Sequence, residues 1–209
     1  MGIKHSCNSY FAEVYYTFLN DKRFRNINMS YPKWFELMDN LGVGRKLGVD
    51  IPDEKTGNLP KKESYDKTYG KNSWGALTIY SNSIGQGEIL LTPLQMANSA
   101  ALIANRGWYY PPHFMIGEKA PDGTWLPVLF DKIETKRNEA HYQVVVDAME
   151  QVVLSGTGTR ARIDSVSVCG KTGTVENKAG EDHSVFMAFA PKEKPKIAIA
   201  AIIENAGFG

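Results

Sequence analysis

Apolar residues recur at three- and four-residue intervals in four stretches of the chain, and this spacing predicts amphipathic helices. The first stretch is Asn8–Leu19. The second follows Ser30, which stands where a helix N-cap is expected, and Gly42 would end it. The third covers 93–104 and opens with a Thr-Pro-Leu-Gln capping box, and the fourth covers 139–154.

Short β-rich runs dominate the last third of the chain. They are Val166–Val168, Val185–Ala190 and Ile197–Ile203, and a charged turn between two prolines joins the last two into a predicted hairpin. A further hairpin is expected between Trp108 and Phe130, around a Pro-Asp-Gly turn. Because the helices come first and the strands late, we expect an α+β fold in which an antiparallel sheet is flanked by helices.

The composition limits the classes of function. A chain of 209 residues, 43% hydrophobic and 22% charged, predicts one domain with a sizeable core. The formal net charge of +1, with no basic block, argues against nucleic acid as a partner. The longest apolar run is far shorter than the roughly 20 residues of a membrane span, and we find no signal peptide or anchor. The stretch Gly42–Gly75 is rich in Gly, Lys, Asp and Pro and predicts a surface loop with little regular structure.

Gly170–Thr174 is the first candidate for chemistry. Its Gly-Lys-Thr sequence is not a phosphate-binding loop, because Ser165 stands where that motif requires a glycine. The preceding valines predict instead that Lys171 lies at the end of a strand. There the lysine offers a fixed positive charge, and the hydroxyls and backbone donors of Thr172 and Thr174 face an extended ligand with a carboxylate.

A second Lys-Thr-Gly triplet shows that the triplet alone is weak evidence. Lys55-Thr56-Gly57 lies within the predicted surface loop, with no strand leading into it, so we interpret it as part of that loop. The same caution holds for Ser6-Cys7-Asn8, which precedes the first predicted helix and by itself would be read as a helix cap. Together with a later, strand-borne Lys-Thr-Gly, however, Ser-x-Asn is part of the signature of penicillin-binding proteins and β-lactamases.

With these motifs the sequence resembles the transpeptidase domain of class B penicillin-binding proteins, most closely the elongation-type penicillin-binding protein 2 group. Further segments resemble the family in the family's order. They are Ile84–Gly87, Leu91–Ala97, Ser155–Arg160, Phe189–Pro191 and Ile203–Gly207. The resemblance implies the transpeptidase fold that penicillin-binding proteins share with serine β-lactamases.

The resemblance also implies a function, peptidoglycan D,D-transpeptidation through a serine acyl-enzyme. Its partners would be peptidoglycan stem peptides and β-lactam antibiotics, with no cofactor and no metal. Among the catalytic residues, Ser6 would relay protons in contact with Lys171, and Asn8 would bind an amide of the substrate. Among the substrate-binding residues, Thr172 and Thr174 would bind the terminal carboxylate, the Thr174 N–H would join the oxyanion hole, and Gly173 would keep the strand edge free of a side chain.

The sequence departs from the family at the nucleophile. The family's Ser-x-x-Lys motif precedes Ser-x-Asn, whereas here the two matches, at Ser30 and Ser64, follow it. We therefore expect residues 1–209 to be a partial transpeptidase domain, incomplete at both ends. It would lack the nucleophile and a C-terminal helix, and would be inactive alone. The whole protein would be anchored in the inner membrane, with this domain in the periplasm and associated with cell-wall synthesis proteins.

Two other classes of protein share these motifs. A non-catalytic β-lactam sensor and a serine β-lactamase are the alternatives, and the segments Ile84–Gly87 and Leu91–Ala97 favour the transpeptidase. A Ser-His-Asp triad around His183 is a weaker hypothesis, because no nucleophile-elbow glycines are present. We interpret His183 instead as a residue that orients the start of a strand.

Overall fold

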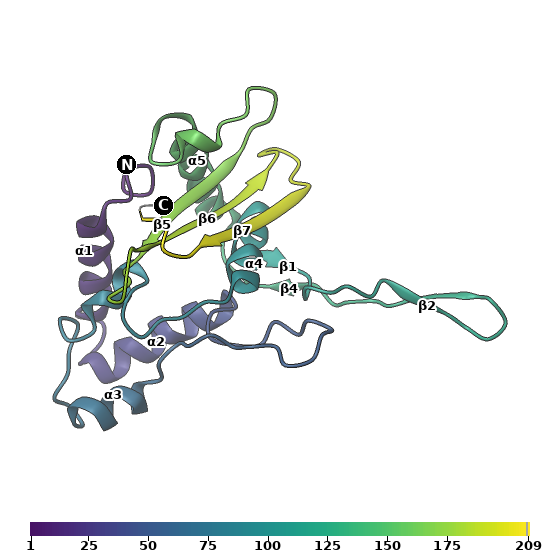
Figure 1. Cartoon of the computed structure of the whole chain (residues 1–209). Coiled ribbons are helices and arrows are strands. Elements are labelled where there is room, and N and C mark those ends of the chain that lie inside the picture. The colour runs from purple at the N-terminus through teal and green to yellow at the C-terminus, as the bar shows by residue number, and fades with distance from the viewer. Residues whose placement is uncertain (208) are drawn as a thin grey trace.

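The computed structural model describes residues 1–207 and 209. The chain forms a helical part and a sheet part that meet along one edge of the sheet (Figure 1). The helical part contains α1 (Asn8–Leu19), α2 (Ile27–Asn40), α3 (Lys62–Tyr69) and the 3-10 helix η1 (Tyr80–Ile84). The sheet part contains α4 (Pro93–Ala104), α5 (Glu139–Ser155), the 3-10 helix η2 (Thr159–Ala161) and the strands β5 (Cys169–Val175), β6 (His183–Ala190) and β7 (Ile197–Ile203).

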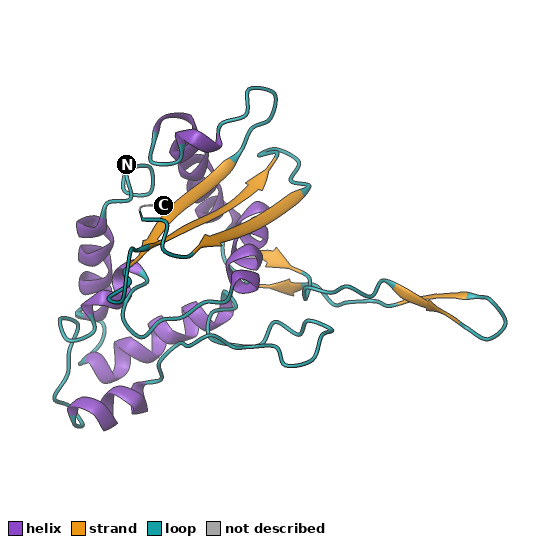
Figure 2. Cartoon of the chain, in the orientation of Figure 1, coloured by secondary structure: helices purple, strands orange, loops and turns teal. Residues whose placement is uncertain are grey.

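The three long strands form one antiparallel sheet in the order β5-β6-β7, as the sequence predicts. The helices α4 and α5 lie behind it (Figure 2), where α5 packs on β5 and α4 packs on β6 and β7. The core between these layers contains Val146 and Met149 of α5 together with Cys169 and Phe189 of the sheet. Because apolar side chains from every layer are buried there, this core fixes β5 against α5.

Aromatic rings fill the core of the helical part. The Tyr31 ring is fully buried and makes edge-on contacts with the rings of Tyr65 and Trp74. Its hydroxyl donates to the Pro60 carbonyl oxygen at 2.7 Å, so the polar end of the buried ring is satisfied. These contacts fix the segment between α2 and η1 onto α2.

The start of the second helix differs from the prediction. α2 begins at Ile27, and its N-cap is Asn26, whose side chain accepts from the Asn28 N–H. Ser30 lies inside the helix, fully buried, and its hydroxyl donates to the Leu19 carbonyl oxygen at 2.7 Å. The prediction of Ser30 as N-cap was wrong because Asn26, four residues upstream, caps the helix with its side chain.

Two further boundaries differ from the prediction. The stretch Gly42–Gly75, predicted to have little regular structure, contains the eight-residue helix α3. The strand that carries Lys171 begins at Cys169, and Val166 makes only an isolated bridge to Ile163. The Lys-Thr-Gly triplet therefore lies within the strand rather than at its end.

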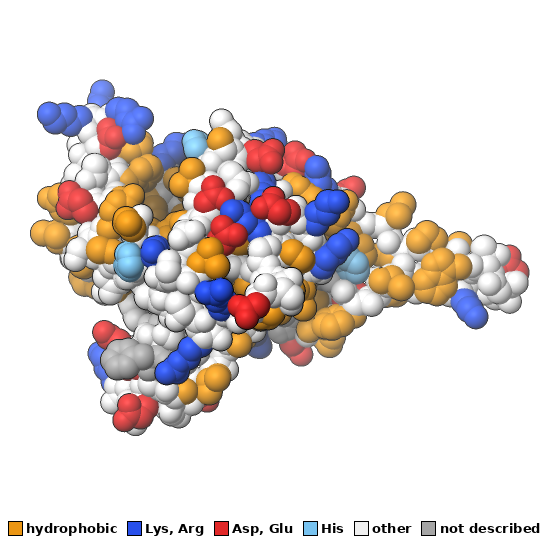
Figure 3. Space-filling model, turned by 90° about the horizontal axis from the view of Figure 1, so that it is seen from above, with side chains coloured by type: hydrophobic (Ala, Val, Ile, Leu, Met, Phe, Trp, Pro, Cys, Tyr) orange, Lys and Arg blue, Asp and Glu red, His pale blue; other side chains and the backbone are white. Residues whose placement is uncertain are grey.

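A long hairpin arm projects from the sheet part, as predicted between Trp108 and Phe130. At its base β1 (Trp108–Tyr109) pairs with β4 (Ile133–Glu134), and further out β2 (Gly117–Lys119) pairs with β3 (Trp125–Pro127). Figure 3 shows apolar side chains along this arm. In the part of the chain that the structure describes, no helix is both long and apolar enough to cross a membrane.

Candidate active site

The sheet edge formed by β5 and the helical part enclose a cavity of about 640 Å³. Three groups of residues line it: the segment at the start of α1, the end of η1 with the turn after it, and the edge of β5 with the loop between α5 and η2. They include Ser6, Asn8, Ser83, Ile84, Gln86, Thr157, Lys171, Thr172, Gly173 and Thr174. All six of the site residues chosen from the sequence therefore lie around one cavity, although 165 positions separate Ser6 from Lys171.

A direct contact joins the two motifs. The Lys171 Nζ donates to the Ser6 Oγ at 2.8 Å, and also to the Thr172 carbonyl oxygen at 2.6 Å. Ser6 is held in a left-handed conformation, with φ of 50°, which is uncommon for a residue other than glycine. Such strain is characteristic of functional sites. The motif does lie at the start of α1, whose N-cap is Cys7, but the side chain of that N-cap makes no cap hydrogen bond.

Partial burial changes the pKa of the Lys171 ammonium group. Desolvation lowers the pKa of its ammonium group below the ordinary 10.5. The same group has a hydroxyl and a backbone carbonyl oxygen as hydrogen-bond partners. A lysine in this setting binds an anion strongly when charged and gives up its proton more readily than a lysine in water.

The side chains of β5 alternate between the two faces of the sheet. Lys171 pairs with Met187, on the face that packs on the helices, whereas Thr172 pairs with Phe186 on the opposite face. Thr174 lies on the same face as Thr172, two positions along. The Thr172 Oγ1 is 2.8 Å from the Thr157 Oγ1, so a second threonine hydroxyl stands at the cavity wall.

Sequence reasoning missed several residues that line this cavity, among them Gln86 and Thr157. The Gln86 Nε2 donates to the Thr174 carbonyl oxygen at 3.1 Å. Thr157 reaches the site because its N–H donates to the Lys4 carbonyl oxygen, next to the first motif. Both residues belong to segments that resemble the family, but the segment pattern did not indicate which side chain faces the cavity.

The family of the chain follows from comparison with known proteins. The whole chain, residues 1–209, matches the model of the penicillin-binding protein transpeptidase domain. The chain belongs to this family. The resemblance found in the motifs is therefore confirmed.

Curated relatives agree with the family match of this transpeptidase domain. The peptidoglycan D,D-transpeptidase MrdA of Acinetobacter baumannii is 34% identical over 98% of this chain, which covers 31% of that protein. MrdA of Haemophilus influenzae is 33% identical over 100% of this chain, which covers 33% of that protein. The chain thus spans about a third of the length of these curated relatives.

Solved structures confirm the fold of the transpeptidase domain. The penicillin-binding protein 2 of Pseudomonas aeruginosa, in complex with WCK 5153, superposes with a TM-score of 0.77 at 29% identity, over 100% of this chain and 44% of that one. That of Helicobacter pylori has a TM-score of 0.79 at 26% identity, over 100% of this chain and 36% of that one. A complex of the Helicobacter pylori protein with MreC is similar to this chain as well, at 26% identity over 100% of this chain and 36% of that one, with a TM-score of 0.78.

Ser30, Ser64 and His183, the other residues considered in the sequence analysis, do not line this cavity. Ser30 is fully buried within α2, and Ser64 lies on α3, which contributes nothing to the described lining of the cavity. The His183 Nδ1 accepts from the Asn205 N–H at 3.0 Å at the start of β6. Among the described residues, no three His, Cys, Asp or Glu side chains gather closely enough to hold a metal ion.

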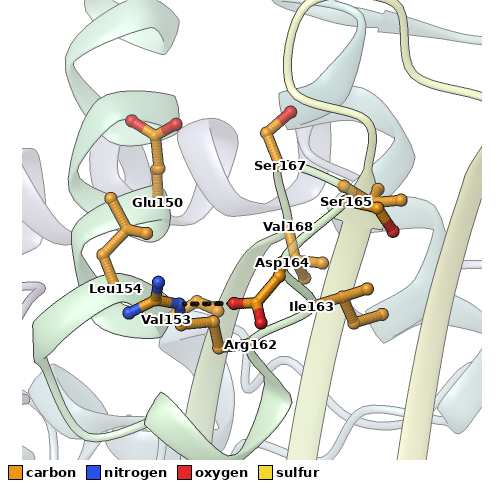
Figure 4. Close-up of a pocket in the computed structure, with 10 residues that line it drawn as sticks. Glu150, Val153, Leu154, Arg162, Ile163, Asp164, Ser165, Ser167 and Val168 are labelled. Atoms are coloured by element: carbon orange, nitrogen blue, oxygen red, sulfur yellow. Dashed lines mark ion pairs between the residues drawn. The ribbon is translucent and has the colours of Figure 1, made fainter.

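A second, smaller cavity of about 280 Å³ lies between the end of α5 and the loop before β5 (Figure 4). Arg162 and Asp164 form an ion pair at 3.4 Å on its rim. None of the motif residues line it, and each of its charged groups is already paired: Arg162 with Asp164 on the exposed rim, and the partly buried Glu150 with Lys192. The cavity lined by Ser6, Asn8 and Lys171 therefore remains the candidate active site.

The two cysteines are free thiols in different surroundings, which makes their reactivity testable. Cys7 is exposed beside the cavity, whereas Cys169 is fully buried. Burial raises the pKa of the Cys169 thiol to about 12, so it carries almost no thiolate at neutral pH. We expect iodoacetamide to modify Cys7 alone in the folded chain, as located by peptide mapping, and Cys169 only after denaturation. Equal labelling of both thiols under native conditions would contradict the buried position of Cys169.

Proposed function

We propose that this transpeptidase domain binds the D-alanyl-D-alanine end of peptidoglycan stem peptides and takes part in D,D-transpeptidation. The observation that carries this proposal is the Lys171–Ser6 hydrogen bond beside the Thr172 and Thr174 edge of β5. It combines a positive charge, a hydroxyl that can pass a proton and a strand edge that can pair with a peptide. The transpeptidase names of the curated relatives support the same reaction.

In the proposed reaction, a serine oxygen attacks the carbonyl carbon between the two D-alanines. The C–N bond breaks, and the terminal D-alanine leaves. The serine keeps the acyl group until an acceptor amine attacks the ester carbonyl, forms a new C–N bond as the serine C–O bond breaks, and returns a proton to the serine oxygen. Ser6 and Lys171 would carry the proton from the attacking hydroxyl to the leaving amine. Thr172 and Thr174 would hold the terminal carboxylate, the Thr174 N–H would stabilise the oxyanion, and Asn8 would bind an amide of the stem peptide.

We further propose that neither Ser30 nor Ser64 is the attacking serine, and that a part of the polypeptide beyond these 209 residues supplies it. The surroundings of the two serines support this, because the Ser30 hydroxyl is buried and donates to a backbone carbonyl oxygen, while Ser64 is on a helix away from the cavity. The relatives, about three times as long as this chain, have room for such a segment. In this proposal the 209 residues bind substrate but form no acyl-enzyme.

Peptide binding tests the proposed function directly. The ¹⁵N-labelled chain is titrated with N-acetyl-D-alanyl-D-alanine, and N-acetyl-L-alanyl-L-alanine is the matched control. We expect the D-peptide to shift the backbone amide signals of Ser6–Asn8 and Thr172–Val175, and the L-peptide to leave them in place. Equal shifts with both peptides, or none with either, would overturn the proposal.

Intact mass spectrometry after incubation with benzylpenicillin tests the proposal on the attacking serine. We expect no increase in mass, and an adduct on Ser30 or Ser64 would make that serine the nucleophile.

The wider setting of the protein is part of the same proposal. We propose that β-lactams compete for this site, since they present an acyl group and a carboxylate to the same residues. The whole protein would be anchored in the inner membrane, with this domain in the periplasm, and would associate with cell-wall synthesis proteins. The Helicobacter pylori relative, which was solved with MreC, supports that last point.

A further inference from the structure

A glutamine outside the three motifs joins the helical part to the edge of β5. The Gln86 Nε2 donates to the Thr174 carbonyl oxygen at 3.1 Å, and the two residues are 88 positions apart. Gln86 is half-buried and lines the cavity. In the described part of the chain, this bond and the Lys171–Ser6 bond are the side-chain hydrogen bonds that cross the cavity from the helical part to β5.

The turn that carries Gln86 holds its side chain in place. Gly85 and Gly87 on either side have left-handed φ values of 73° and 76°, which glycine adopts without strain. Between them, the Gln86 N–H donates to the Ser81 carbonyl oxygen at 3.1 Å and so ties the turn to η1. A side chain on such a turn has a defined direction, because its own backbone is fixed on both sides.

The Thr174 carbonyl lies on the free edge of the sheet. β5 pairs with β6 on one side only, so its alternate carbonyls point away from the sheet. The carbonyl oxygens of Thr172 and Thr174 both accept from side chains at the cavity, Lys171 and Gln86 respectively, which shows that these alternate carbonyls point outward. An extended ligand on this edge would donate an N–H to the Thr174 carbonyl oxygen, and that oxygen has a second lone pair for it.

We propose that Gln86 is a positioning residue, which holds the Thr174 carbonyl in the direction that a bound peptide needs. The inference rests on the proposed function, because it concerns how the same site receives its peptide. Gln86 fixes one end of the Lys171–Thr174 edge, and the Ser6–Lys171 bond fixes the other. Without the amide, the Thr174 peptide unit would have to be ordered by the ligand itself, and the cost of that ordering would weaken binding.

Two variants of Gln86 and one control test this inference. Gln86→Leu keeps the volume of the side chain but removes the donor, and Gln86→Glu places an acceptor against the Thr174 carbonyl oxygen. Gln151→Leu makes the same change on an exposed glutamine of α5 and serves as the control. The measurements are the Thr174 carbonyl ¹³C chemical shift, the affinity for N-acetyl-D-alanyl-D-alanine, and the Tm of each variant.

We expect Gln86→Leu to shift the Thr174 ¹³C signal and to weaken peptide binding about three- to tenfold, at an unchanged Tm. Gln86→Glu should weaken binding further, and Gln151→Leu should change nothing. A Gln86→Leu variant that binds the peptide as tightly as the original chain, or keeps the Thr174 signal in place, would overturn the inference while the proposed function stands. An original chain that binds no peptide would overturn both. A lowered Tm without a change in the Thr174 signal would mean that Gln86 contributes only to the stability of the fold, and this result would also overturn the inference.

Discussion

Replacing Lys171 with methionine is expected to weaken binding of N-acetyl-D-alanyl-D-alanine by about 30- to 150-fold, which corresponds to roughly 2–3 kcal/mol for the loss of a charge-assisted hydrogen bond. Methionine has a similar length but offers neither charge nor donor. The hydroxyl of Ser6 would then lose its hydrogen-bond donor as well. Affinity is measured by NMR titration, on the backbone amide signals of Thr172 and Thr174.

The folded state should survive this substitution. Because burial lowers the pKa of Lys171, the folded chain disfavours the charged form, and this unfavourable contribution is present below the lowered pKa and disappears above 10.5. Methionine removes the contribution at neutral pH, so we expect a Tm no lower than that of the original chain. Lys194→Met makes the same change on an exposed lysine of the turn between β6 and β7 and should bind peptide normally. A Lys171→Met variant that binds equally well would remove Lys171 from the site.

The pH dependence of peptide binding provides a second test of the role of Lys171. The carboxylate of the peptide is attracted to the charged form of Lys171, so affinity should fall as pH rises through the lowered pKa of this group, at a pH below the ordinary 10.5. In Lys171→Arg the charge persists through that range, because arginine stays protonated. The fall in affinity should therefore be absent from the Lys171→Arg chain, and its persistence there would assign the pH dependence to another group.

Hydrophobic periodicity predicted the secondary structure of those segments whose own sequence determines their conformation. The helices at Asn8–Leu19 and Pro93–Ala104 agree with the predicted ranges, because both have apolar residues at helical spacing and the second also has a capping box at its N-terminus. The helix α3 was missed because its eight residues are mostly polar and it depends on the burial of Tyr65 against rings far away in the sequence. Short helices of this kind are stabilised by tertiary contacts that no local pattern contains.

The site was predictable in part for the same reason. Lys171, Thr172 and Thr174 follow from a strand pattern together with a short motif, and the resemblance adds Ser6 and Asn8. The contact between Ser6 and Lys171 depends on packing over the whole chain, and so does the bond from Gln86 to the Thr174 carbonyl oxygen. Spacing along the sequence contains no information about such contacts, which is why Gln86 and Thr157 emerged only from the structure.

The two Lys-Thr-Gly triplets differ in what their glycines do, and this gives a second prediction with a large effect. Gly57 has a φ of +61°, and a methyl group there would meet the Leu90 carbonyl oxygen at 2.1 Å and the Gln95 Oε1 at 2.8 Å. That Gln95 oxygen accepts from the Thr92 N–H in the capping box of α4. Gly57→Ala should therefore strain the backbone and displace the start of α4, at a cost of about 3 kcal/mol or more. In a chain of this length, that loss lowers the Tm by roughly 6–12 °C.

Gly173→Ala should have the opposite pattern, a nearly unchanged Tm with weaker peptide binding. A methyl group on Gly173 would make only ordinary contacts, 3.6 Å from the Val185 Cβ, so the sheet has room for it. Gly173 lines the cavity, however, and the added volume should weaken binding about fivefold or more. Gly75→Ala, with open space around it, is the matched control and should stay within about 0.5 kcal/mol of the original chain. If Gly57→Ala were as stable as this control, or if Gly173→Ala unfolded the chain, the assignment of one triplet to the loop and the other to the site would be wrong. Thermal unfolding followed by circular dichroism, with the peptide titration on the same samples, separates these outcomes.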